Sequence, residues 1–156
     1  VLMKVEWINP FLAATLGTFQ RMLKLKVSPG KPHLYTDENN IKDISGVIGL
    51  SGTLRGAVVI GMPQSVALAA VKHLVGVEYS TMNADVSDAI GELANIIAGY
   101  AKKDLKGEEI QIALPTVISG PKHKVAMPSD VAVVVIPFQS DIGSFVIEVG
   151  IRKAEV

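Results

Sequence analysis

The chain has 156 residues, 49% of them hydrophobic, and its 15 basic and 15 acidic side chains balance to a formal net charge of zero. This balance argues against the basic surface that a nucleic-acid-binding protein presents. No apolar run approaches the roughly 20 residues that a membrane-spanning helix requires. The sequence contains no cysteine, which excludes disulfides and thiolate metal sites.

Length and a mean hydropathy of +0.38 favour one folded domain over residues 1–156 rather than a disordered chain. Residues 1–4 show neither the apolar core nor the cleavage site of a signal peptide. We therefore expect a cytoplasmic protein without membrane association.

The first half of the chain predicts one helix and three strands. Asn9 followed by Pro10 is typical of a helix N-cap and first helical residue, and apolar residues at helical spacing extend this helix to about residue 24. Ser28-Pro29-Gly30 marks its end. The sequence then predicts a short strand at 34–36, a turn at 37–40, and two apolar strands within 44–62, joined at Ser51-Gly52.

The second half begins with two helices, one from Pro63 to just before Gly76 and a longer one to about residue 106. Asn83 or Asp85 caps the longer helix, and Gly107 stops it. Residues 109–120 predict a strand that leaves the sheet at Pro115, and Lys122-His123-Lys124 is assigned to a loop. Residues 131–138 and 144–151 predict a closing hairpin.

The order of helix, strand and hairpin thus occurs twice, and the segments 54–62 and 142–150 share a pattern. This repetition indicates an internal pseudo-duplication. The expected fold class is α+β, with one largely antiparallel sheet and the long helices packed on one of its faces.

The long helix carries an unusual outward face. Its apolar residues form one stripe that must face the sheet, namely Val86, Ile90, Leu93, Ile97 and Tyr100. Asn95 points away from this stripe, and Glu92 lies beside it at a spacing of three residues. Gly91 and Gly99 each cost a helix interior about 1 kcal/mol relative to alanine. Because the inward stripe is already filled, we expect both glycines to make room for an external partner.

Glu92 and Asn95 suggest a particular chemistry. A carboxamide does not titrate usefully, but it donates and accepts hydrogen bonds at once and can therefore orient a water molecule. Orientation is sufficient when the bond to be broken is already activated, as in some phosphoryl transfers. Glu92 is either an anchor for a cation on the partner or a base.

The motif "GELANIIAG", with its Glu-x-x-Asn, resembles the signature helix of the CheC/CheX/FliY phosphatases of bacterial chemotaxis, and "PTVISG" (115–120) resembles the strand-end motif that follows it. The resemblance covers nearly the whole chain and implies a phosphatase acting on the aspartyl phosphate of a CheY-type response regulator. It further implies that Asn95 orients the attacking water, that Glu92 pairs with the regulator's active-site lysine, and that Mg²⁺ belongs to the regulator.

Some members of this family carry a second Glu-x-x-Asn on their first helix, but residues 9–25 contain none. One site per chain resembles the CheX branch, which is typically homodimeric. We therefore expect a homodimer, with 131–138 or 55–62 as strands whose edges pair between copies.

Two alternatives remain open. The chain is either this phosphatase or a non-catalytic module that docks on a response regulator through the same helix face; a weaker alternative is an unrelated ligand-binding domain. His33, His73 and His123 lack the spacing of a metal site, so no metal or cofactor is expected in this chain. Lys122-His123-Lys124 is either a solvated loop or a basic patch that attracts an acidic regulator surface.

Overall fold

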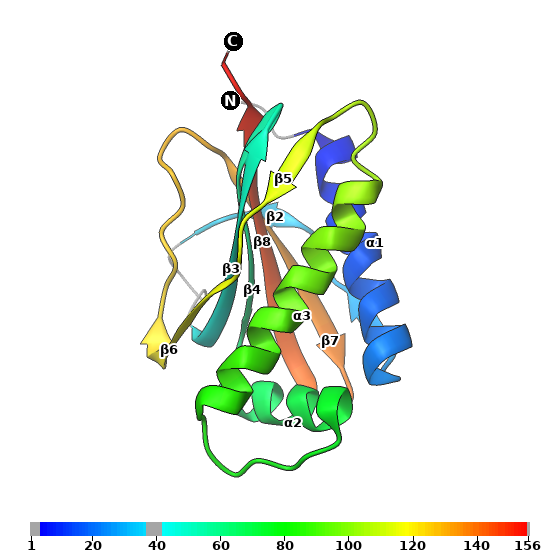
Figure 1. Cartoon of the computed structure of the whole chain (residues 1–156), viewed down its shortest axis with the longest axis vertical. Coiled ribbons are helices and arrows are strands. Elements are labelled where there is room, and N and C mark those ends of the chain that lie inside the picture. The colour runs from blue at the N-terminus through cyan, green and yellow to red at the C-terminus, as the bar shows by residue number, and fades with distance from the viewer. Residues whose placement is uncertain (1–3, 37–41, 156) are drawn as a thin grey trace.

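The computed structural model describes residues 4–36 and 42–155 (Figure 1). Its helical elements are α1 (Val5–Thr18), a π-helical turn η1 (Phe19–Leu23), α2 (Gln64–Val75) and α3 (Ala84–Lys103). Its strands are β1 (Val27–Pro29), β2 (His33–Leu34), β3 (Lys42–Gly52), β4 (Leu54–Met62), β5 (Ile110–Ile112), β6 (Thr116–His123), β7 (Val133–Ser140) and β8 (Gly143–Lys153). None of the described helices is long and apolar enough to cross a membrane.

The strands form one sheet in the order β1-β7-β8-β4-β3-β5, in which β2 also pairs with β7 and β6 with β3. Every described strand pair is antiparallel. The order is symmetric in the kinds of strand: a short strand lies at each edge, and the two long hairpins, β7–β8 and β3–β4, lie between them. The short strands after α1 pair with the hairpin of the second half, and those after α3 pair with the hairpin of the first half. The topology therefore matches the predicted α+β fold and its internal pseudo-duplication.

Helices α1 and α3 lie side by side across one face of the sheet, and α2 packs at one end of that layer (Figure 1). The core between the layers is filled by aromatic and branched side chains, including Phe11, Phe19 and Phe138, each fully buried. Phe145 stacks on both Phe19 and Phe138, with ring centroids 4.6 and 5.2 Å apart. This continuous core fixes the position of α3 on the sheet.

The first helix begins earlier than the sequence predicts. It starts at Val5, with Lys4 rather than Asn9 as its N-cap, and Pro10 lies inside it. Trp7 and Ile8 are buried, and their packing against the core stabilises the additional turn although the proline removes one backbone hydrogen bond.

The short strands also differ from the prediction. Strand β1 occupies the segment expected to be a helix stop, and β2 begins at His33. The turn expected at 37–40 lies outside the described residues. After a break at 113–115 the chain returns to the sheet as β6 and pairs with β3, rather than leaving the sheet at Pro115.

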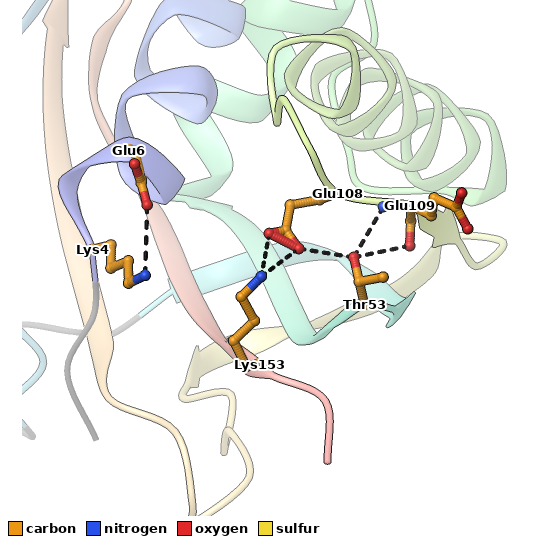
Figure 2. A network of polar contacts seen from close by, with 6 residues as sticks. All are labelled: Lys4, Glu6, Thr53, Glu108, Glu109 and Lys153. Carbon is orange, nitrogen blue, oxygen red and sulfur yellow. Dashed lines mark hydrogen bonds and ion pairs between the residues drawn. The ribbon is translucent and has the colours of Figure 1, made fainter. Parts of the chain in front are cut away.

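Two ion pairs bind distant segments together. Lys42 of β3 and Glu148 of β8 form a fully buried pair, with Nζ and Oε2 2.6 Å apart. Figure 2 shows the second pair: Lys153 Nζ donates to both Glu108 oxygens at 2.8 and 2.6 Å, and Thr53 Oγ1 donates to Glu108 Oε1 at 2.9 Å. The second network fastens the segment that follows α3 to the β3–β4 turn and to the end of β8.

Candidate functional site

Helix α3 has a side-chain cap at its N-terminus and favourable charges at both ends. The Asn83 side chain accepts a hydrogen bond from the Val86 backbone N–H at 2.9 Å, which fixes Asn83 as the N-cap. Asp85 lies in the first turn, and Lys102 and Lys103 lie in the last, so the charges complement the helix dipole. The helix ends at Lys103, three residues earlier than predicted. Its buried residues include Val86, Ile90, Leu93 and Ile97, as the periodicity predicts.

Small residues bring α3 unusually close to the sheet. A Cβ built at Gly46 of β3 would lie 2.9 Å from the Ala94 Cβ and 3.3 Å from the Ile90 carbonyl oxygen. On the helix itself, a Cβ at Gly91 would lie 3.1 Å from Val117 Cγ2 of β6. These contacts fix the height and rotation of the helix, because neither element has room to move closer.

The contact at Gly91 corrects one sequence-based interpretation. We expected this glycine to make room for an external partner, but Gly91 is buried and faces Pro115 and Val117. Its role is internal packing against the start of β6. The first residues of the "PTVISG" segment, Pro115 and Val117, thus form part of the surface on which α3 packs.

Glu92 and Asn95 lie together on the outward side of α3, as the sequence predicts. Glu92 is exposed and Asn95 is half-buried. Among the described residues, neither side chain makes a hydrogen bond or ion pair. A carboxylate and a carboxamide at a spacing of three residues on a fixed helix are therefore free to bind groups outside the chain.

Tyr100 does not belong to the buried stripe to which the sequence assigned it. The residue is 36% exposed, and two cations lie near its ring: the Arg21 guanidinium carbon is 4.7 Å and the Lys103 Nζ 5.1 Å from the ring centroid. The packing of Arg21 of η1 onto Tyr100 cannot be read from the sequence, because the two residues are far apart along the chain.

A shallow surface depression begins at Asn95 and extends toward the C-terminal end of α3. Its lining comes from three elements, with Met22 from η1, Ile112 from β5, and Ile96, Gly99 and Tyr100 from α3. We refer to these five residues as the Gly99 depression. Sequence analysis missed it, since only its α3 members lie near one another along the chain.

The other candidate residues serve structural roles. His123 lies at the end of β6 rather than in a loop; its Nδ1 donates to the Gly120 carbonyl at 2.7 Å, and its Nε2 therefore accepts from Ser45 Oγ at 2.8 Å. In the described part of the chain, no three histidine, aspartate or glutamate side chains gather into a group that could hold a metal ion. On α1, Thr15 and Thr18 are fully buried, so that helix presents no second copy of the site there.

The arrangement is suited to binding and positioning groups outside the chain. A free carboxylate can bind a cation, and a free carboxamide can hold a water molecule between its donor and acceptor. Glu92 is exposed and Asn95 half-buried on a helix held by its packing, so both are accessible to a group outside the chain.

A family model described as chemotaxis phosphatase CheX matches residues 44–139, which is more than half of the chain and includes the whole of α3. The chain belongs to the CheX family of chemotaxis phosphatases. Membership confirms the enzyme class predicted from the sequence, a phosphatase, and the relationship to the CheC-like fold.

Individual CheX and CheC-like proteins resemble this chain over most of its length. A CheY-P phosphatase CheX of Thermotoga maritima is 28% identical over 126 residues, covering 79% of this chain and 81% of the relative. A CheC-like superfamily protein of Shewanella sp. PV-4 has a TM-score of 0.90 and 35% identity, covering 96% and 99% of the two chains. The CheX–CheY–BeF3–Mg²⁺ complex of Borrelia burgdorferi matches at a TM-score of 0.83 and 28% identity, covering 96% and 100%.

Proposed function

We propose that this chain, as one CheX-like domain over residues 1–156, hydrolyses the aspartyl phosphate of a CheY-type response regulator. The observation that carries the proposal is the pair Glu92 and Asn95, which emerge together from a fixed helix without a hydrogen-bonding partner among the described residues. The Borrelia burgdorferi complex, in which a CheX relative accompanies CheY, supports a partner of this class.

In the proposed mechanism Asn95 enters the regulator's active site. Its carboxamide accepts a hydrogen bond from a water molecule, so that a lone pair of the water oxygen points toward phosphorus. The water then attacks phosphorus in line with the aspartyl oxygen, whose bond to phosphorus breaks, and the products are the free aspartate and inorganic phosphate. Because the acyl phosphate is intrinsically labile, orienting the water is sufficient to accelerate its hydrolysis. Glu92 pairs with a lysine of the regulator and fixes the approach of the helix.

The charge on the phosphoryl group must be balanced by the regulator. The Mg²⁺ and BeF3 named for the Borrelia burgdorferi complex accord with a metal ion held on the CheY side. We therefore assign no metal-binding step to this chain, and its residues contribute position rather than electrostatic neutralisation.

The experiment compares phosphate loss from radiolabelled, phosphorylated CheY-type regulators with and without this protein. The parent should accelerate the loss, and Asn95→Ala should not. The control is Lys102→Ala, an exposed residue of the same helix that lies outside the site. Binding without acceleration by the parent would support the non-catalytic docking module instead.

We also propose a homodimer, with a correction to the strands expected to form it. Strands β4 and β7 lie inside the sheet, paired on both sides, so the segments 55–62 and 131–138 have no free edge. Among the described strands, four pair with one neighbour only, namely β1, β2, β5 and β6; the longest of them, β6, pairs with β3 and leaves its other edge available to a second copy. Sedimentation equilibrium should give twice the chain mass of 16.5 kDa; a single chain mass at micromolar concentration would contradict the dimer.

A further inference from the structure

The Gly99 depression lies directly beside the proposed catalytic amide. Asn95 itself contributes to its rim, and the depression continues along the last turns of α3. Two of its apolar members are unusually accessible, since Met22 is 40% and Tyr100 36% exposed. These two exposed side chains, next to the unpartnered Glu92 and Asn95, give the depression an apolar surface that a partner's apolar side chain could cover.

Gly99 has no structural reason within the described chain to be glycine. A Cβ built there meets no atom within 4 Å, and the backbone is that of an ordinary helix, without a positive φ. Alanine would therefore fit and would favour the helix. This separates Gly99 from Gly91, whose Cβ would press on Val117. The absence of a side chain at Gly99 lets an external surface approach the helix backbone.

The charges around the depression are unevenly distributed. Arg21 and Lys103 flank the Tyr100 ring at its far end, and neither forms an ion pair with another described residue. At the opposite end, Asp88 and Glu92 are exposed and negative. A complementary partner presents a basic group near Glu92 and a carboxylate near Arg21 and Lys103.

We propose that the Gly99 depression is the docking surface for a segment of the phosphorylated regulator that carries an apolar side chain with a carboxylate beside it. The apolar side chain packs on Met22 and Tyr100 over Gly99, and the carboxylate faces Arg21 and Lys103. This inference rests on the proposed function. The occupant is the regulator rather than a second copy of this chain, because a copy seated on the depression would cover Asn95 and block its substrate.

The first test fills the depression. Gly99→Leu should raise the KM for the phosphorylated regulator about tenfold or more, as expected for a blocked contact at an interface centre, and leave kcat nearly unchanged. Gly99→Ala should raise the melting temperature by about 2–4 °C while raising KM more modestly. The control is Ala84→Leu, which adds the same side chain to the exposed first turn of the same helix.

The second test removes the charges. Arg21→Gln/Lys103→Gln should weaken binding of the beryllofluoride-activated regulator about five- to tenfold and reduce the dependence of Kd on salt. The control, Lys102→Gln/Lys106→Gln, removes the same net charge from exposed lysines outside the depression. Thermal melts of all variants exclude misfolding as the cause.

The outcomes separate this inference from the proposed function. Unchanged KM in Gly99→Leu, together with an inactive Asn95→Ala, would overturn the docking surface and leave the mechanism intact. Loss of regulator binding in Gly99→Leu, with an Asn95→Ala variant as fast as the parent, would uphold the docking surface and refute the mechanism. A change in sedimenting mass of Gly99→Leu without a change in KM would assign the depression to a second copy and overturn the inference.

Discussion

Gly46 of β3 and Ala94 of α3 are in direct contact: a Cβ at Gly46 would lie 2.9 Å from the Ala94 Cβ. Ala94 immediately precedes Asn95, so this contact sets how far the proposed catalytic amide stands above the sheet. Gly46 also pairs with Val117, the residue that packs against Gly91. The two glycines and the β3–β6 pair thus form one rigid support beneath the site.

Enlarging this contact should displace the helix. Gly46→Ala places a methyl group against Ala94 and the Ile90 carbonyl oxygen, so α3 must shift outward. We expect the free energy of unfolding to fall by about 1–3 kcal/mol, in the range of overpacked cores. Urea denaturation measures the change. Gly49→Ala in the same strand is the control, because its Cβ would lie an ordinary 3.6 Å from Ala113; an equal loss in both variants would refute the role of the contact.

The buried pair Lys42–Glu148 makes a different prediction. Burial raises the pKa of Glu148 and Lys42 opposes the rise. Lys42→Met leaves an unpaired buried carboxylate and should cost about 3–5 kcal/mol at neutral pH. Chemical denaturation from pH 7 to pH 4 measures the effect.

The pH dependence of the Lys42→Met variant has a definite sign. Glu148 then has a folded pKa raised above its unfolded value, so the native state binds the extra proton and is stabilised as the pH falls. The loss relative to the parent should shrink on acidification, and Lys42→Met/Glu148→Met should recover much of it. A loss that is constant with pH would show that the carboxylate is not its source.

The network in Figure 2 predicts the opposite trend. The hydrogen bond from Lys153, aided by Thr53, lowers the pKa of Glu108 below its ordinary value of 4.5. A depressed folded pKa gives stability that is present above the unfolded value and disappears as the pH falls through the folded one. Parent and Lys153→Met should therefore differ in free energy of unfolding at pH 7 and converge in acid. Lys26→Met is the control, as an exposed cation without an ion pair among the described residues; divergence in acid would contradict the assignment.

Much of α3 could be predicted from the sequence, because its information is local. The spacing of Val86, Ile90, Leu93 and Ile97 fixes which side is buried, and the outward direction of Asn95 follows from it. The cap at Asn83 is likewise a short-range signal. The sequence therefore predicts that Glu92 and Asn95 face outward, and the structure confirms it.

What could not be predicted depends on contacts between distant segments. The sequence does not reveal that Gly91 packs inside the protein, because its neighbour Val117 belongs to a strand that reaches the helix only in the folded chain. The helical spacing predicts a buried Tyr100, and the sequence does not reveal that its ring instead contacts Arg21, because Arg21 belongs to η1, far away along the chain. Likewise, the segments 55–62 and 131–138 do not reveal their neighbours along the chain, and only the sheet order shows that both strands are internal.

The most direct test of the proposed mechanism is the single-turnover rate of phosphate loss at saturating Asn95→Ala, measured beside the affinity of this variant for the beryllofluoride-activated regulator. Asn95 acts on the reacting water, so the saturated rate should fall about 100-fold or more, while affinity stays within about threefold of the parent. Asn95→Gln, with the same amide on a longer stem, should also be slow because the water is misplaced. A saturated rate in Asn95→Ala equal to that of the parent would contradict the assignment of Asn95 as the residue that orients the water.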